Sequence, residues 1–247
     1  MRKALWSMAL LGYVTFVVGC AETKKVEPAA DAAKKGANVD TGARKASPGA
    51  EAVVHAAIAN RLAMYGDANK DAISLIAAAR ILGDLGIQTG KYEIRTVVTQ
   101  AGAKGDAKVV TAAGSGQTDY TIGAVLARAR QYAGGRKDLL ALADEAAKST
   151  TRGRAGGPMM VPARVDTGHT NLHTISYRGG EPATVVVVGS PDADFDLVVK
   201  DESGNVVCRQ TGLGDSACRW TPKWTGQYRV EVANIGRASN QYRVWTN

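Results

Sequence analysis

Three aspartates alternate along one short stretch of the C-terminal half, at Asp192, Asp194 and Asp196. Alternate residues of an extended strand point to the same side, so their carboxylates are expected to share one face or rim of a sheet. Ca²⁺ is held by about six to eight oxygen ligands, and carboxylates supply them readily. The stretch is therefore a candidate calcium site. A structural alternative stays open, in which Asp192 and Asp194 cap a turn and Asp196 accepts hydrogen bonds from backbone N–H groups.

Other residue patterns argue against catalysis. The sequence Gly114-Ser115-Gly116 lacks the strand, turn and helix that surround a nucleophilic serine in hydrolases. His169 and His173 are four residues apart, but no carboxylate or cysteine nearby completes a zinc ligand set. No phosphate-binding loop or dinucleotide fingerprint is present. We therefore expect a protein that is not an enzyme and that needs no cofactor.

Four aromatic residues of the C-terminal half have two possible roles. They are Trp220, Trp224, Tyr228 and Trp245. Exposed together, they would form an aromatic binding face. Buried, they would fill a core or the corners at strand ends, and we favour this interpretation because β-sandwich cores use the same residue types.

Residues 1–20 follow the pattern of a bacterial export signal. Met1-Arg2-Lys3 is positive, and the apolar stretch after it is shorter than the ~20 residues that a membrane-spanning helix needs. The stretch ends in Val17-Val18-Gly19-Cys20, which resembles the lipobox of bacterial lipoproteins. The resemblance implies a signal peptide over residues 1–19, cleavage before Cys20, and acylation of the Cys20 thiol and amine. Palmitate and the other acyl chains would then hold the protein on a membrane.

The residue after Cys20 is Ala21 rather than Asp. By the same resemblance, this implies a lipid-anchored protein of the outer membrane that faces the periplasm or the cell surface. An ordinary signal with an incidental cysteine, or an uncleaved anchor, is the alternative. Export would place Cys208 and Cys218 in an oxidising compartment, where these two remaining cysteines are expected to form a disulfide. A metal pair lacks further ligands at a suitable spacing.

The composition then divides the rest of the chain. Residues 20–50 contain almost no large apolar side chain, which predicts a lipidated flexible tether. Residues 51–150 show the apolar period of helices and predict a small bundle of two helical hairpins, the first helix ending at Gly66-Asp67. Within them, the glycine-dotted stretch 87–118 is either a β-hairpin or a mobile insertion.

Residues 149–158 form a linker by composition, and the pattern after it is typical of strands. Residues 157–247 contain seven or eight short alternating runs, which predict a separate sandwich or jelly-roll domain. The expected fold class is therefore α + β as separate domains, with a small α-helical hairpin bundle followed by an all-β jelly-roll-like sandwich.

The C-terminal motifs are similar to those of the bacterial pre-peptidase C-terminal domain family. They are the strand Asp194-Phe195-Asp196-Leu197-Val198-Val199, the turn Asp201-Glu202-Ser203-Gly204-Asn205 and the late run from Pro222 to Val232. The resemblance covers residues 164–247 and implies a jelly-roll sandwich. Members of the family are attached to secreted proteases and other exported proteins, and some bind calcium or polymeric substrates. No protease precedes the domain in this sequence, so the resemblance supports the fold more than an activity.

The charge distribution bears on partners. The net charge is +8, yet nine Lys/Arg oppose nine Asp/Glu from Gly157 to Asn247, so the excess lies in the N-terminal half. An exported protein rarely meets nucleic acid, so we expect none as a partner and an anionic membrane surface as the neighbour. We hypothesise an envelope lipoprotein, bound to membrane lipid through acylated Cys20, that acts as a non-catalytic binding or assembly module for an envelope protein or polymer. The alternative is an accessory subunit that binds substrate or calcium for a separate hydrolase.

Overall fold

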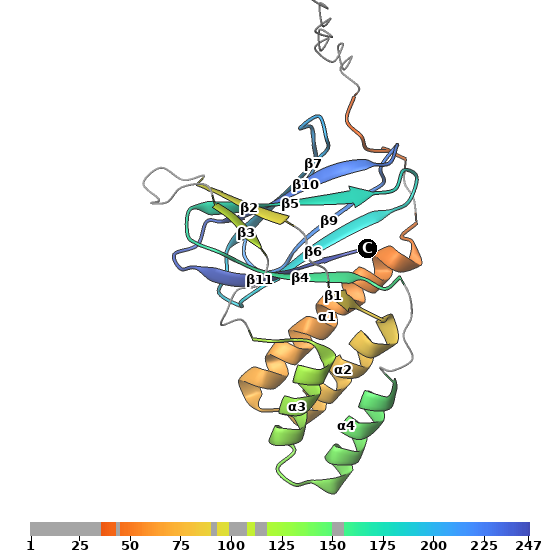
Figure 1. Ribbon diagram of the computed structural model, residues 1–247, viewed down its shortest axis with the longest axis vertical. Helices are drawn as coiled ribbons and strands as arrows, with labels where there is room; N and C mark the ends of the chain where they lie inside the picture. Colours follow the sequence, from red (N-terminus) through yellow and green to blue (C-terminus); the bar gives the residue numbers. More distant parts are fainter. Residues whose placement is uncertain (1–35, 43–44, 90–92, 99–107, 112–117, 150–155) are drawn as a thin grey trace, which may run out of the picture. The chain divides into compact units, whose positions relative to one another are not determined.

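The computed structural model describes residues 36–42, 45–89, 93–98, 108–111, 118–149 and 156–247 (Figure 1). Cys20 and the signal-like segment before it lie outside these residues. Lys35–Asn247 form one compact unit. Among the helices in the described ranges, none is long and apolar enough to cross a membrane. The expected order of helices followed by a β-sandwich is confirmed.

Two helical hairpins lie in the described ranges, as the apolar period predicted. The helices are α1 (Pro48–Asn69), α2 (Ala72–Leu85), α3 (Ile122–Tyr132) and α4 (Lys137–Ser149). Small side chains line the contacts between them, and many of the buried residues of α1 and α2 are alanines. Alanine leaves room for close approach of helix axes, so the bundle is tightly packed.

The boundary between α1 and α2 differs from the prediction. The expectation that Gly66-Asp67 ends the first helix is wrong, since α1 continues to Asn69. Gly66 serves packing instead, because a Cβ atom there would lie 2.8 Å from Cγ of Leu75 on α2. The side chain of Asp71 then accepts hydrogen bonds from two backbone N–H groups in the first turn of α2 and caps it.

The strands form two sheets. They are β1 (Gln88–Thr89), β2 (Glu93–Val98), β3 (Lys108–Thr111), β4 (Met159–Val165), β5 (His169–Tyr177), β6 (Ala183–Gly189), β7 (Phe195–Lys200), β8 (Val206–Gln210), β9 (Ser216–Trp220), β10 (Gly226–Asn234) and β11 (Asn240–Thr246). Sheet A has the order β1-β4-β11-β6-β9, and sheet B has the order β3-β2-β5-β10-β7-β8. Their inner faces enclose a core that includes Phe195, Leu197, Tyr228 and Tyr242.

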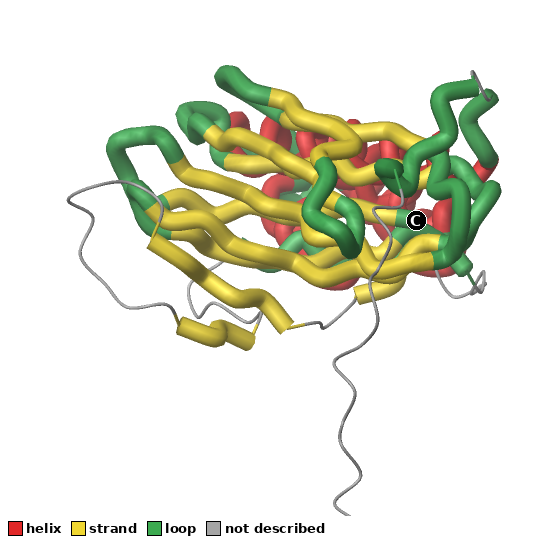
Figure 2. The backbone as a smooth tube through the Cα atoms, turned by 90° about the horizontal axis from the view of Figure 1, so that it is seen from above, coloured by secondary structure: helices red, strands yellow, loops and turns green. Residues whose placement is uncertain are grey.

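The centre of sheet A is buried on both sides. Every residue of β6 is buried. Val185 and Val187 belong to the core between the sheets, whereas Val186 and Val188 pack with residues of α1 and α2. The helices therefore cover the outer face of sheet A, and Figures 1 and 2 show them on one side of the sandwich only.

The helices and the sandwich thus share a buried cluster. Trp245 of β11 and Met160 of β4 lie in it together with Val53 and Leu82 of the helices. The sequence placed a domain boundary at the linker before residue 157, because composition and period change there. In the structure, side chains from before and after that linker pack in one buried cluster, so the helices and the sandwich form one compact unit. A local sequence pattern cannot indicate that a distant segment covers the face of a strand.

The glycine-dotted stretch 87–118 contributes strands to the sandwich. β2 and β3 pair in antiparallel fashion, so of the two interpretations the structure has the β-hairpin. β2 also pairs with β5, with Ile94 opposite His173, and Ile94 is buried. β1 pairs with β4 of sheet A. Strands β1, β2 and β3, which lie within the segment predicted to be helical, therefore extend both sheets. β1 and β2 pair with backbone groups at the edges of β4 and β5 that would otherwise be unpaired.

Residues 36–42, which we call the strap, lie against one end of the sandwich. Asn38 is fully buried there. Its Oδ1 accepts hydrogen bonds from the backbone N–H groups of Lys223 (2.9 Å) and Trp224 (3.1 Å). Its Nδ2 donates to the carbonyl oxygen of Trp224 at 3.1 Å and to Oε2 of Glu202 at 3.3 Å. The side chain therefore joins two loops of the sandwich.

The strap backbone is held at the same end. The N–H of Asn38 donates to Oδ2 of Asp201 at 2.8 Å, and the Tyr228 hydroxyl donates to the Asn38 carbonyl oxygen. The N–H of Asp40 donates to the carbonyl oxygen of Thr221 at 2.7 Å. The sequence placed this segment in the tether of residues 20–50. The structure differs because these polar partners compensate for the missing apolar side chains.

Tyr120 connects α3 to the sandwich. Its ring centroid lies 5.1 Å from Cζ of Arg128 on α3 and 4.2 Å from Cζ of Arg243 on β11. Nη2 of the buried Arg243 donates to the carbonyl oxygen of Thr118 at 2.8 Å. Burial lowers the pKa of Arg243 to about 10 and raises the pKa of Tyr120 to about 12. Arg243 therefore stays charged at neutral pH and gains a cation–π contact.

Replacement of Asn38 tests the strap. Asn38→Ala would remove the acceptor of two backbone N–H groups, so we expect the free energy of unfolding to fall by about 2 kcal/mol. Urea unfolding followed by circular dichroism measures this change. Asn69→Ala is the control, because Asn69 is exposed and its side chain makes one hydrogen bond, to the Tyr65 carbonyl oxygen. Equal effects of the two substitutions would contradict a stabilising role for the strap.

Candidate binding surfaces

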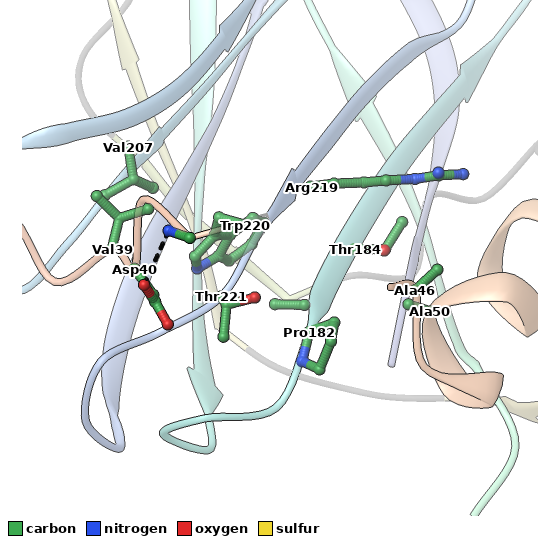
Figure 3. A pocket seen from close by; sticks show the side chains of 12 residues that line it. Val39, Asp40, Ala46, Ala50, Pro182, Thr184, Val207, Arg219, Trp220 and Thr221 are labelled. Atoms are coloured by element: carbon green, nitrogen blue, oxygen red, sulfur yellow. Dashed lines mark hydrogen bonds between the residues drawn. The ribbon is translucent and has the colours of Figure 1, made fainter. Parts of the chain in front are cut away.

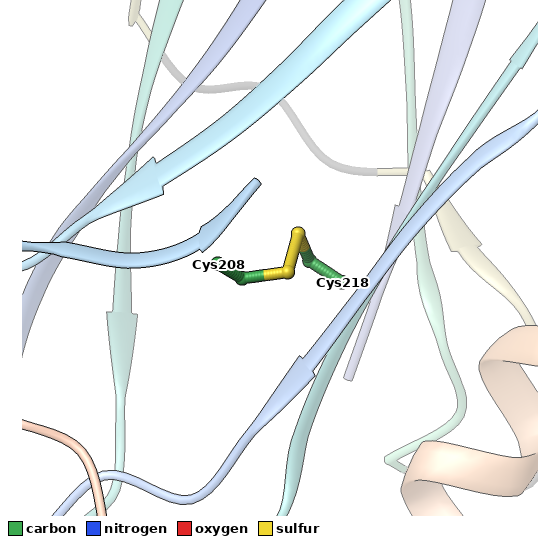
Figure 4. Close-up of a disulfide and its surroundings, with 2 residues drawn as sticks. All are labelled: Cys208 and Cys218. Carbon is green, nitrogen blue, oxygen red and sulfur yellow. A yellow bond between two sulfur atoms is a disulfide. The ribbon is translucent and has the colours of Figure 1, made fainter. Parts of the chain in front are cut away.

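The predicted disulfide is present. Cys208 of β8 and Cys218 of β9 are bonded, with their Cα atoms 5.9 Å apart (Figure 4). β8 is the edge strand of sheet B and β9 is the edge strand of sheet A. The bond therefore closes one side of the sandwich. Such a cross-link stabilises mainly by restricting the unfolded chain.

The three aspartates of the candidate calcium site lie along the approach to β7. Asp192 is exposed in a turn, Asp194 precedes β7, and Asp196 lies within it. Oδ1 of Asp194 and Oδ1 of Asp196 are shielded from solvent and have no hydrogen-bond partner. Among the described residues, no group of three or more His, Cys, Asp or Glu side chains is arranged to hold a metal ion. The calcium site stays a prediction, and the structure does not bring these three carboxylates together as a ligand set.

The aromatic residues are mainly core residues. Trp220, Tyr228 and Trp245 are buried, and the rings of Trp220 and Tyr228 lie 5.3 Å apart. Trp224 is half-buried and its Nε1 donates to Oε1 of Glu202 at 2.6 Å. These side chains therefore do not form one exposed aromatic face.

His173 belongs to a polar network inside the sandwich. Its Nε2 lies 2.7 Å from the hydroxyl oxygen of Tyr242, which accepts a hydrogen bond from Nδ2 of Asn171 at 2.8 Å. The Thr96 hydroxyl donates to Oδ1 of Asn171 at 2.6 Å. His173 is fully buried, and burial lowers its pKa to about 3. The ring is therefore neutral in the folded protein at neutral pH and has a structural role.

A pocket of about 270 Å³ lies beneath the strap. Figure 3 shows Val39 beside Val207 on one side of it, with Arg219 and Thr184 nearer the start of α1. Asp40 and Thr221 contribute further polar groups. The volume is slightly below the ~300–1,000 Å³ of ordinary small-molecule sites. This pocket could hold a small polar ligand, but not a length of polymer.

The sandwich end opposite the strap carries exposed apolar side chains. We call the loops 190–194, 211–215 and 235–239 the distal loops. Leu213 is 82% exposed and Ile235 is 49% exposed. Asp194 joins them, because its backbone pairs with Leu213 and its carbonyl oxygen accepts a hydrogen bond from the Ile235 N–H at 3.1 Å. This end therefore presents a small apolar patch beside an acidic side chain.

The backbone forces Leu213 outward. Gly212 and Gly214 have φ values of +117° and +95°, a region that other residues rarely adopt. The loop is attached to α1, because Asp215 forms an ion pair with Arg61. Leu213 is therefore an exposed apolar side chain on a loop that is tied to α1.

The outer face of sheet B is open and basic. Its basic side chains are Arg95 of β2, Lys200 of β7, Arg209 of β8 and Arg229 of β10. Glu231 accepts hydrogen bonds from Nζ of Lys200 at 2.9 Å and from Nε of Arg229 at 2.7 Å. We call this surface the basic face. It contrasts with the outer face of sheet A, which the helices cover.

The helical layer has an apolar groove of about 400 Å³ between α2 and α4. Ile73, Ala77 and Ile81 line it along one stripe of α2, and Leu142 faces them from α4. Ile73 is 57% exposed. The groove is therefore a further exposed apolar surface.

Comparisons with known proteins found no matching protein-family model and no matching curated protein. Part of the chain is similar to solved β structures. The pre-peptidase C-terminal domain of collagenase from Bacillus anthracis is 15% identical, with 35% of this chain and 87% of that domain covered and a TM-score of 0.29. PliG of Aeromonas hydrophila, a periplasmic inhibitor of g-type lysozyme, is 14% identical over 36% of this chain and 86% of that chain, with a TM-score of 0.28.

A carbohydrate-binding module, CBM36 in complex with calcium and xylotriose, is 14% identical over 34% of this chain and 98% of that chain, with a TM-score of 0.21. The pre-peptidase C-terminal domain, to which the motifs of residues 164–247 point, is thus among the folds that this chain is similar to.

Burial of His173 predicts a pH-dependent stability. The unfolded chain has the ordinary histidine pKa of about 6.5 and takes up the proton first, whereas the folded protein takes it up only near its pKa of about 3. The contribution of neutral His173 to the free energy of unfolding is therefore complete above the pKa of the unfolded chain. As the pH falls below that pKa, the contribution is lost by about 1.4 kcal/mol per pH unit. We expect His173 to account for about 2 kcal/mol of the stability lost between about pH 7.5 and about pH 5.

His173→Gln removes the titrating group and keeps a hydrogen-bonding side chain. The free energy of unfolding, measured with urea at about pH 7.5 and at about pH 5, should fall less in this variant than in the unchanged protein, and the difference should be about 2 kcal/mol. His55→Gln is the matched control, because His55 is exposed on α1. The same pH dependence in all three proteins would contradict the prediction.

Proposed function

We propose that the protein is a membrane-anchored lipoprotein of the bacterial envelope and that it acts as a non-catalytic binding module. Acylated Cys20 would hold it on the outer membrane, and the distal loops would contact an envelope protein. The observation that carries this proposal is that the entry of the chain and the exposed leucine lie at opposite ends of the sandwich. The chain enters at the strap end, and Leu213 projects from the other end.

The lengths of the elements support this arrangement. β10 has nine residues and spans about 30 Å, which separates the strap from the distal loops. Sixteen residues from Cys20 to Lys35 reach at most about 55 Å. A lipid at Cys20 would therefore keep the strap end near the membrane and leave the distal loops accessible.

The chemistry of the distal loops indicates the kind of partner. Burial of a leucine side chain contributes about 1.5–3 kcal/mol. The carboxylates of Asp192 and Asp194 lie in the neighbouring loop, and the exposed Arg237 lies two residues from Ile235, so a complementary surface would have an apolar pocket with charged residues of both signs at its rim. A second role, as an accessory subunit that binds the substrate of a separate hydrolase, is favoured by the basic face.

Replacement of Cys20 tests the anchor. Cys20→Ala removes the thiol that would be acylated, so the protein should lose an acyl label and move from the membrane fraction to the soluble envelope fraction. Cys208→Ala/Cys218→Ala is the control, because these cysteines form the disulfide and should leave acylation unchanged. Unaltered labelling and fractionation of the Cys20 variant would exclude lipidation at this residue.

A photo-crosslinking side chain at Leu213 tests the contact surface. In cells it should yield one major crosslinked protein, which is then purified for binding measurements. The same side chain at Val206, which is 47% exposed at the strap end, is the control and should not yield that product. Leu213→Ser should weaken binding of the purified partner by roughly tenfold or more, since an apolar contact is lost. Equal crosslinking from both positions, or unchanged affinity, would contradict a role for the distal loops.

A further inference from the structure

The basic face contains a depression of about 370 Å³ with two arginines at its wall. Arg95, Leu172, Thr174 and Arg229 line it. Its volume falls within the ~300–1,000 Å³ that is usual for ligand sites. Two guanidinium groups and a hydroxyl around one hollow are hydrogen-bond donors without a carboxylate among the described lining residues.

The strand register explains why the two arginines face a common space. Leu172 of β5 lies opposite Arg95 of β2, and Thr174 of β5 lies opposite Arg229 of β10. The two arginines therefore flank β5, two strand spacings and two residues apart, which places their Cα atoms about 12 Å from each other. Side chains as long as arginine can close this distance around a single ligand group.

Neighbouring contacts orient these side chains. Glu231 holds Nε of Arg229, and the Arg229 side chain is nevertheless 46% exposed, so its terminal nitrogens can meet a ligand. The Arg95 side chain is exposed, and it forms no ion pair or side-chain hydrogen bond with the described residues. The second oxygen of Glu231 is bound to Lys200. The one acidic side chain at the centre of the face therefore positions two cations and does not block the hollow.

The cations continue across the sheet. From β2 to β8 the strand order is β2-β5-β10-β7-β8, which spans about 19 Å. Among the side chains that the structure describes, this surface carries the cations Arg95, Lys200, Arg209 and Arg229 and the acids Asp196 and Glu231, and Arg209 lies opposite Val198 of β7. A row of this length exceeds what a single small anion can contact, and it matches an extended chain with repeated negative charges.

We infer that the basic face binds an oxyanionic polymer, with one carboxylate or phosphate group of that polymer held between Arg95 and Arg229. Arginine suits both groups, because its planar fork donates two parallel hydrogen bonds to them. The hollow favours a discrete group of a soluble polymer over the flat surface of a bilayer. The site does not depend on lipidation or on the distal loops, so each proposal can fail without the other.

Binding of defined polymers to the full-length protein in nonionic detergent tests this inference. The probes are oligogalacturonate, which carries carboxylates, and inorganic polyphosphate, with neutral dextran as the uncharged control. Titration calorimetry at low and high salt should show binding of at least one polyanion, weaker at high salt, and none of dextran. Binding of the unacylated Cys20→Ala protein, without detergent, to phosphatidylglycerol vesicles but not to phosphatidylcholine vesicles, together with no binding to either soluble polyanion, would overturn the inference and favour a membrane surface.

Substitutions then locate the site. Arg95→Gln/Arg229→Gln should reduce the affinity for the polyanion by more than roughly tenfold, because charge-assisted hydrogen bonds are lost. Arg178→Gln removes one exposed guanidinium group at the strap end, away from the hollow, and should leave the affinity unchanged. Arg229→Lys keeps the charge but loses the fork, so it should also weaken binding. Equal losses in the double variant and in Arg178→Gln, or full affinity in the double variant with an unchanged melting temperature, would overturn the inference.

Discussion

The structure depends on the burial of sheet A from both sides. β6 is buried along its whole length, and its side chains alternate between the core of the sandwich and the cluster beneath the helices. Val186, Val188 and Trp245 would meet water if α1 and α2 were absent. Each would cost about 1.5–3 kcal/mol or more on exposure, so the helical layer is an integral part of this sandwich. Because one outer face is occupied in this way, the other sheet is left to face solvent.

Polar groups at the junction give the two layers a defined register. Nε1 of Trp245 donates to Oδ1 of Asn60 on α1 at 3.3 Å, so the largest apolar side chain of the cluster also has a directional bond. Tyr120 contacts Arg243 of the sandwich, and Nη2 of Arg243 donates to the carbonyl oxygen of Thr118 at 2.8 Å. Apolar contact alone would permit sliding of the helices over the sheet, whereas buried polar groups lose free energy when their partners are displaced.

The same architecture distributes the surfaces that can act on partners. The strap occupies one end of the sandwich, the exposed leucine of the distal loops occupies the other, and the basic face lies on the sheet between them. The point where the chain enters is thereby separated from the distal loops and from the basic face, and none of these surfaces is built from helical residues. The helices contribute support instead, since the ion pair of Arg61 with Asp215 fixes the loop that carries Leu213. An attachment point distant from the contact surfaces suits a module that is held on a membrane and binds in front of it.

Local patterns of the sequence determined the strands of the C-terminal half, the helical hairpins and the disulfide, because alternation, helical period and cysteine count are properties of short segments. Only the tertiary structure decided that Val186 faces the helices, that Asn38 is a buried anchor and that Arg95 and Arg229 line the same hollow. Each of these three features depends on contacts between residues far apart in the chain. Such contacts follow from which strands and helices become neighbours, and no spacing along the sequence specifies them.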